Sequence, residues 1–91
     1  SEIRNDIAEN NVDILATVEQ GQAEVLEIKV KEQYNDKKIF EFKFPRNAII
    51  GVVQRRQQVI IPKGDTQLKT DDLLIIFTKS DDAQVIREFF K

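Results

Sequence analysis

Residues 48–72 read AIIGVVQRRQQVIIPKGDTQLKTDD, and this stretch decides the fold. An apolar run rich in β-branched residues, 48–53, is followed by a polar turn. A second apolar run, 59–61, then ends at Pro62. Two such runs around a short polar segment are typical of a β-hairpin. A third apolar run at 73–77 follows further polar residues, so the pattern predicts three strands in one third of the chain.

Two more strands are predicted upstream of this hairpin. In 23–30, Leu26, Ile28 and Val30 alternate with polar residues and therefore share one face of a strand. A weaker alternation over 12–16 predicts a partner strand. With these segments the predicted sheet has four to five strands and is mostly antiparallel.

The first residues are predicted to be a connector to something upstream. Ile3 and Ile7 lie one helical turn apart among polar neighbours, which predicts a short helix. We interpret residues 1–11 as the connector and 12–91 as the domain. A chain of this size buries only about 60–65% of its unfolded surface, so we expect it to need a partner surface.

Local periodicity does not settle the segment before Pro45. The phenylalanines at 40, 42 and 44 alternate as in a strand, but Phe40 and Phe44 also lie one helical turn apart. We predict a short helix near 38–42, which must end before Pro45. We expect all the phenylalanines to form the core, although an aromatic stripe could instead stack bases. They are Phe40, Phe42, Phe44, Phe77, Phe89 and Phe90.

The clearest element is a C-terminal helix over 80–90. Ser80 is a favourable N-cap residue, and Asp81 and Asp82 place negative charge on the first turn. Apolar residues recur at spacings of three and four and form one face. The predicted fold class is therefore α+β, with a small mostly antiparallel sheet, a short helix near 38–42 and the 80–90 helix packed on the sheet.

The composition excludes several kinds of chemistry. Histidine and cysteine are absent, which removes the usual catalytic triads and zinc and redox sites. The three glycines form no phosphate-binding motif, and the Asp pairs at 71–72 and 81–82 suit turns and helix starts better than catalysis. We therefore expect no enzyme activity and no metal site. No apolar run approaches about 20 residues, so we expect no direct membrane insertion and a cytosolic location.

Charge is unevenly distributed along the chain. Residues 1–28 hold one basic and seven acidic side chains, residues 29–63 nine and three, and residues 64–91 four and six. The basic middle could be a solvated face or an anion-binding patch. Within it, arginine guanidinium groups could hold a phosphate and Asn47 could read a base edge. A small nucleic-acid-binding domain is therefore one alternative, which salt-dependent binding would support.

Four segments together resemble a known family. They are AEVLEIKV (23–30), KIFEFKFPRNAIIGVVQR (38–55), VIIPKGDTQLKTDDLLIIF (59–77) and the final amphipathic helix. Their order resembles the TrkA C-terminal domain, which is the C-terminal lobe of RCK domains. One departure is Asp71, where the family most often has glycine. Because Asp tolerates a left-handed conformation better than most residues, we expect the turn to be kept.

The resemblance implies a cytosolic regulatory domain of a potassium uptake system. Such lobes form homodimers and act on a membrane ion-transport subunit through a preceding nucleotide-binding domain, where NAD or ATP would bind. We expect no cofactor in this domain and no nucleic-acid partner. An equivalent domain of a cation/proton antiporter or an anion transporter is the main alternative. The protein would be peripheral to the inner face of the membrane.

Some family members bind cyclic di-AMP at the dimer interface, with contacts that correspond to residues 39–50 of this chain. The resemblance and the guanidinium argument together assign five candidate ligand-binding residues. They are Ile39, Phe40, Arg46, Asn47 and Arg55. A ligand that contacts both protomers would change the dimer geometry and so gate the membrane subunit.

Overall fold

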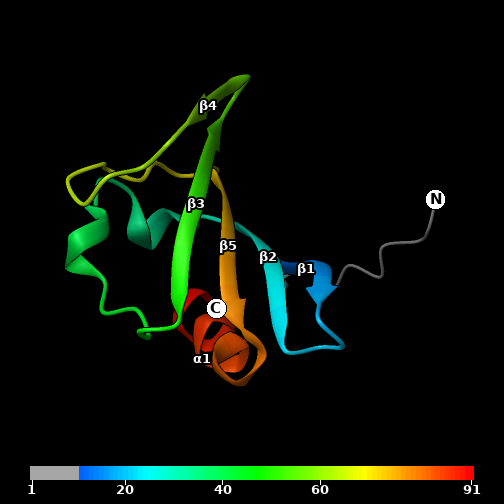
Figure 1. Cartoon of the computed structure of the whole chain (residues 1–91). Helices are drawn as coiled ribbons and strands as arrows, with labels where there is room; N and C mark the ends of the chain where they lie inside the picture. Colours follow the sequence, from blue (N-terminus) through cyan, green and yellow to red (C-terminus); the bar gives the residue numbers. More distant parts are fainter. Residues whose placement is uncertain (1–10) are drawn as a thin grey trace.

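The computed structural model describes residues 11–91, so the helix predicted at Ile3 and Ile7 lies outside the described residues. It shows one five-stranded antiparallel sheet in the order β1-β2-β5-β3-β4, with a C-terminal helix on one face (Figure 1). This confirms the predicted α+β class. The elements are β1 Val12–Val18, β2 Ala23–Lys29, η1 Glu32–Tyr34, η2 Ile39–Glu41, β3 Ala48–Arg55, β4 Gln58–Ile60, β5 Leu73–Lys79 and α1 Ser80–Phe90.

The two central strands carry the core. Leu26 lies opposite Ile76, and Ile28 lies opposite Leu74, and all four side chains are fully buried. Directly opposed residues of an antiparallel pair point to the same face, so the alternation predicted for 23–30 is confirmed. We call this side of the sheet, which α1 covers, the inner face, and the opposite side the outer face.

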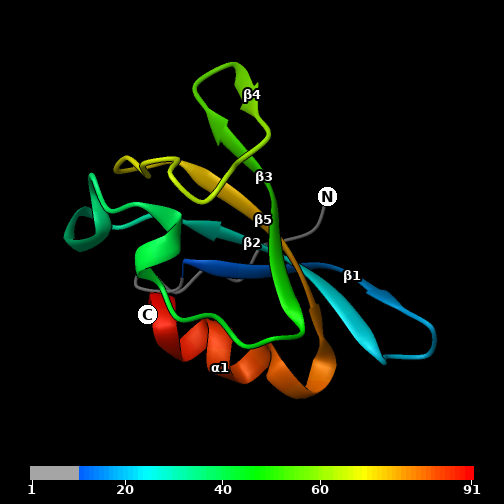
Figure 2. The ribbon, with the colours of Figure 1, turned by 60° about the vertical axis from the view of Figure 1, so that its left-hand side comes forward.

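Helix α1 lies along the inner face (Figure 2). It buries Ala83, Ile86 and Phe90, which recur at the spacings of one helix face. The predicted capping role of Ser80 is wrong. Ser80 is already the first helical residue and its hydroxyl donates to the carbonyl of Gly21, while Lys79 occupies the N-cap without a side-chain hydrogen bond. The hydroxyl thus ties the helix start to the β1–β2 turn.

The predicted hairpin is β3 and β4. Val53 pairs with Ile60 and Arg55 with Gln58, which leaves a two-residue turn in which Arg56 adopts φ 57°. The register of β3 against β5 shifts between Ile50 and Val52. The short helix predicted near 38–42 is also present. It is η2, one turn of 3-10 helix.

An aromatic cluster closes the C-terminal end of α1. Its ring centroids lie 5.0–6.2 Å apart, mostly in tilted or edge-to-face pairs that aromatic rings favour. Its members are Tyr34, Phe42, Phe44, Phe89 and Phe90. The prediction that all six phenylalanines form the core is wrong for two of them. Phe40 points outward from η2 and is 64% exposed, and Phe77 lies on the outer face of β5 and is 47% exposed.

The turns before β5 are held by local hydrogen bonds. The hydroxyl of Thr66 accepts from the Lys63 amide at 2.9 Å, and the Thr66 amide donates to the Lys63 carbonyl at 3.0 Å. Hydroxyl side chains commonly close turns onto the backbone in this way. Asp71 adopts φ 74°, so the left-handed turn expected in place of the family glycine is kept.

Candidate functional site

An apolar pocket of about 290 Å³ lies between η2, the start of β3 and the residues that follow β4. Its lining is Ile39, Phe44, Ala48, Ile49, Ile50, Pro62 and Lys63. We refer to it as the apolar pocket. Concave apolar sites with a few polar groups are the usual places for small ligands.

Backbone hydrogen bonds hold two walls of the apolar pocket together. The Ile39 amide donates to the Thr66 carbonyl at 3.0 Å, and the Phe40 amide donates to the Gly64 carbonyl at 2.9 Å. The third wall is anchored because the Phe44 ring packs against Phe42 in the aromatic cluster. The shape of the pocket therefore depends on segments that are distant in the sequence.

Three exposed apolar residues line the apolar pocket or are next in sequence to a lining residue. Phe40 is 64% exposed, Ile49 is 61% exposed and Ile61, next to Pro62, is 69% exposed. We call these three residues the apolar rim. Exposed apolar side chains that form a contiguous patch mark an interaction surface, whereas single exposed ones need no explanation.

Cationic side chains accompany this apolar surface. Lys63 is the charged residue in the pocket lining, and the Lys38 ammonium lies 5.8 Å from the centroid of the Phe40 ring. Arg46 is exposed on the short loop between two lining residues. None of these three cations forms an ion pair within residues 11–91. The arrangement suits a ligand that combines a flat apolar part with an anionic part.

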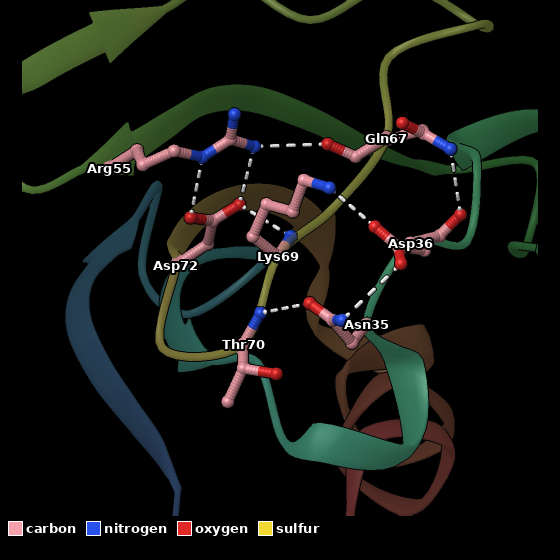
Figure 3. A network of polar contacts seen from close by, with 7 residues as sticks. All are labelled: Asn35, Asp36, Arg55, Gln67, Lys69, Thr70 and Asp72. Atoms are coloured by element: carbon pink, nitrogen blue, oxygen red, sulfur yellow. Dashed lines mark hydrogen bonds and ion pairs between the residues drawn. The ribbon is translucent and has the colours of Figure 1, made fainter.

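Arg55 lies away from this pocket, in a polar network (Figure 3). Its Nε and Nη2 donate to the two carboxylate oxygens of Asp72 at 2.9 and 2.8 Å, and Nη2 also donates to the Gln67 carbonyl at 3.0 Å. Asp72 is only 1% exposed and accepts a third hydrogen bond, from the Lys69 amide at 2.9 Å. The side-chain hydrogen bond with Asp72 raises the pKa of Arg55 above its ordinary value. Its charge therefore persists at every physiological pH.

The rest of the network connects the turn before β5 to the turn after η1. Lys69 forms an ion pair with Asp36, and the Thr70 amide donates to the Asn35 side-chain oxygen at 2.9 Å (Figure 3). Because the guanidinium of Arg55 is held by a buried carboxylate, its observed contacts are structural. A ligand contact by Arg55 would need to use the remaining nitrogen of the guanidinium.

The structure thus separates the five predicted site residues. Ile39 lines the apolar pocket, Phe40 belongs to its rim, and Arg46 and Asn47 lie on the loop beside it. The Asn47 carbonyl accepts from the Lys79 amide at 3.1 Å, which fixes this loop to the end of β5. Arg55 lies outside the apolar pocket, in the polar network with Asp72.

Sequence reasoning missed the lining contributed by the turn after β4. Local sequence gives Pro62 and Lys63 only the role of a turn. They line the same pocket as Ile39 because the tertiary structure brings the two segments together. Within residues 11–91 no group of three or more metal-ligating side chains gathers. No helix in that same part of the chain is long and apolar enough to span a membrane.

The chain is similar to proteins of one known family. The family model of the TrkA-C domain matches residues 25–91. The Trk system potassium uptake protein TrkA homolog of Archaeoglobus fulgidus is 35% identical over 81 residues, and TrkA homolog 1 of Methanosarcina mazei is 32% identical over 82 residues. Each alignment covers 88% of this chain, but the chain spans only 18% of either relative.

A solved structure agrees with these matches. It is described as "Structure of RCK domain with cda", and it superposes with a TM-score of 0.64 at 25% identity. The match covers 74% of this chain and 97% of that chain. Because the family model matches 25–91, which is most of the chain, the chain belongs to the TrkA-C domain family.

Proposed function

We propose that this chain is a dimerising, ligand-sensing regulatory domain of a potassium uptake system. Its relatives carry the name Trk system potassium uptake protein, which favours potassium transport over the antiporter and anion-transporter alternatives. The proposed role is regulatory and non-enzymatic, on the cytoplasmic side of the membrane. A preceding nucleotide-binding domain would connect it to the membrane subunit and would carry any NAD or ATP.

One observation supports this proposal above the others. The apolar pocket has an exposed apolar rim and three neighbouring cations that form no ion pair within residues 11–91. Burial of the exposed apolar surface against a partner would be favourable, and an anion could form charge-assisted hydrogen bonds with the cations. The region therefore has the properties of a binding surface.

The ligand we propose is cyclic di-AMP. Its adenine rings suit the apolar walls, and its phosphates suit Arg46 and Lys63. The pocket volume of about 290 Å³ lies at the lower end of the range for small-molecule sites. One protomer would hold part of a dinucleotide, so two copies would share one ligand. The solved RCK domain matched by this chain is described as a structure "with cda".

Such a shared ligand would regulate through dimer geometry. It can shift the arrangement of two protomers only by the difference between its affinities for the two arrangements. A ligand that contacts both pockets at once has that difference, because it spans the distance between them. The changed geometry would then reach the membrane subunit through the preceding domain, and the coupling would be reciprocal.

Thermal unfolding with cyclic di-AMP tests the proposed ligand. At about 100 times the Kd the ligand should stabilise the domain by about 2.7 kcal/mol, which for this size is a rise in Tm of roughly 10–20 °C. The variants Arg46→Ala and Asn47→Ala should each bind about tenfold more weakly, since each removes hydrogen bonds to a charged or polar ligand. Arg56→Ala is the matched control, because Arg56 is an exposed arginine of the hairpin turn.

Two results would contradict the proposed ligand. One is an unchanged Tm of the parent protein at millimolar cyclic di-AMP. The other is equal binding by Arg46→Ala, Asn47→Ala and Arg56→Ala, which would place the ligand elsewhere. A strictly monomeric domain at high concentration would contradict the dimer itself.

A further inference from the structure

A polar cleft of about 800 Å³ lies between the tip of the β3–β4 hairpin and the turn that precedes β5. Residues 55–58 form one wall, which we call the hairpin wall, and residues 69–72 form the other, the turn wall. The polar cleft shares no lining residue with the apolar pocket. It is therefore a separate cavity.

Strand register explains why the two walls lie at the same end of the sheet. β3 pairs with β5 as far as Gln54, which lies opposite Leu73, the first residue of β5. Residues 55–58 therefore extend beyond the end of β5, where β3 continues in its pairing with β4 (Figure 2). Residues 69–72 come immediately before β5. The projecting hairpin and this turn leave the polar cleft between them.

Arg55 connects the two walls and supplies a fixed donor. Its Nε and Nη2 are held by Asp72 and by the Gln67 carbonyl, whereas Nη1 donates to no group within residues 11–91 (Figure 3). Asp72 is buried, while 29% of the Arg55 side chain is exposed. The N–H groups of Nη1 thus belong to a lining residue that is already ordered. Such a donor loses little conformational entropy when it binds a ligand, which favours affinity.

The rest of the hairpin wall supplies further donors and no carboxylate. Arg56 is exposed and forms no ion pair within residues 11–91. The side-chain amides of Gln57 and Gln58 are exposed and form no hydrogen bond in that same part of the chain. A guanidinium presents several N–H groups in one plane, which matches the oxygens of an anionic group. The hairpin wall is therefore suited to an oxyanion.

The turn wall has a different chemistry, because it presents an accessible carboxylate. Asp71 is 74% exposed, and its ion pair with Lys29 is long, at 3.8 Å. The Asp71 carboxylate can therefore accept hydrogen bonds from a ligand, as can the exposed hydroxyl of Thr70. Lys29 and the neighbouring Lys69 disfavour a cationic group at this wall, so hydroxyl groups are the matching donors.

The composition of the lining selects the class of ligand. All eight lining residues are polar or charged, so an aromatic or apolar ligand would desolvate polar groups without pairing them. Three of them are basic and two are acidic, which leaves an excess of positive charge. A phosphate group carries more charge and more oxygens than a carboxylate, and it can contact Nη1 of Arg55 and the Arg56 guanidinium together.

We propose that the polar cleft binds a small phosphorylated polyol. The phosphate lies on the hairpin wall, and the hydroxyl groups donate to the turn wall. This site goes beyond the regulatory function proposed above, since cyclic di-AMP occupies the other cavity in that proposal. The two sites differ in chemistry, because one is lined by apolar residues and the other by polar ones.

NMR titration of the isotope-labelled chain tests this site. Glucose 6-phosphate at millimolar concentration should shift the backbone amide signals of 55–58 and 69–72 and the Nε–H signal of Arg55. Glucose lacks the anion and inorganic phosphate lacks the hydroxyl groups, so each should bind about tenfold more weakly than glucose 6-phosphate. Gluconate, which has a carboxylate in place of the phosphate, should also bind more weakly.

Two variants test the two walls separately. Arg56→Ala should weaken the binding of glucose 6-phosphate and of inorganic phosphate about tenfold, since it removes the unpaired guanidinium. Asp71→Gly should weaken glucose 6-phosphate relative to inorganic phosphate, because glycine keeps the turn at φ 74° while the acceptor for the hydroxyl groups is lost. Arg46→Ala is the matched control, because Arg46 is an exposed arginine outside the polar cleft.

Several results would overturn the proposed site. They are the absence of any shift at 55–58 and 69–72, equal binding of inorganic phosphate and glucose 6-phosphate, and equal binding by Arg56→Ala and the parent. Loss of binding in Arg46→Ala, with shifts at 39–50, would place the anion beside the apolar pocket instead. The binding of cyclic di-AMP is tested independently, because Arg46 and Arg56 exchange the roles of test and control between the two experiments.

Discussion

Both faces of the sheet carry apolar side chains, but those on the inner face are buried and those on the outer face are exposed. On the inner face Leu26, Leu74 and Ile76 are fully buried beneath α1, whereas on the outer face Phe77 and Ile49 are 47% and 61% exposed. Both faces would gain about 25 cal/mol for each Å² of apolar area removed from water. Only the inner face achieves that gain within residues 11–91, and the outer face is therefore where an additional partner would stabilise the molecule most.

The cationic side chains differ in the same way between two regions. Arg55 is held by a buried carboxylate and a backbone carbonyl, while Arg46 and Lys63 beside the apolar pocket have no ion pair within residues 11–91. A charge that the fold already neutralises is part of the structure. A charge left in water beside an apolar concavity is available to a ligand, and this difference separates structural from functional residues better than residue type.

The largest expected effect contrasts adjacent residues on opposite faces. Ile76→Ala should lower the free energy of unfolding by about 3–4 kcal/mol, because it leaves a cavity in the closed core. Phe77→Ala should cost about 1 kcal/mol or less in the monomer, since its side chain is half-exposed. Urea unfolding at low protein concentration measures both, because dimer formation would otherwise add stability. Equal losses would mean that the outer face is as closed as the inner one.

The next effect concerns the polar network. Arg55→Met should cost about 2–3 kcal/mol, because it keeps the apolar stem but leaves the buried carboxylate of Asp72 without its charged partner. Lys69→Met is the control, since its ion pair with Asp36 is exposed and should be worth under about 1 kcal/mol. Because the pKa of Arg55 is raised in the folded protein, this stabilisation is fully present below the ordinary pKa of an arginine and is lost only as the pH rises through the higher pKa of the folded state.

A smaller effect concerns the contact between Gly51 and Phe77. Gly51→Ala should cost about 1 kcal/mol, because the added methyl must displace the aromatic ring. In a Phe77→Ala background the same substitution should cost nothing, since the obstructing ring is gone. The coupling energy from this double-mutant cycle measures the contact directly. Additive effects would show that the ring does not lie over β3.

The smallest effect concerns the turn at Asp71. Asp71→Gly should raise stability by about 0.5 kcal/mol, because glycine adopts φ 74° without steric cost while losing somewhat more entropy on folding. Asp71→Val should lower stability by about 1–2 kcal/mol, since a β-branched residue is strained at positive φ. A stabilising Asp71→Val would contradict the left-handed turn. Thermal unfolding resolves both changes.

Local patterns were sufficient for the strands, the C-terminal helix and part of the core. The strands at 23–30 and 48–61 and the helix at 80–90 follow from periodicity, and the fold class was correct. The prediction that Phe77 belongs to the core is wrong. All five residues of 73–77 are apolar, so alternation could not show which of them face the helix and which face outward. Ser80 was assigned a cap because its type favours one, but Gly21, distant in sequence, accepts its hydroxyl instead.

The candidate site was predictable only in part. The family resemblance makes Ile39 a candidate, and Arg46 and Asn47 are candidates through the resemblance together with their hydrogen-bonding chemistry, whereas Pro62 and Lys63 follow from neither. They reach Ile39 because backbone hydrogen bonds from 39 and 40 bind the segment 64–66. Arg55 was grouped with the site because an arginine in a basic segment looks available. Its partner Asp72 lies 17 residues away in the sequence.

The sequence by itself determined the strands, the helix, the family and the absence of histidine and cysteine chemistry. These depend on residue types and on spacings of a few residues, which local sterics and burial patterns control. Only the tertiary structure decided which sheet face α1 covers, which arginine is neutralised and which residues meet in the apolar pocket. Those outcomes depend on contacts between residues far apart in the chain, where a single sheet face or a single carboxylate can satisfy only one partner.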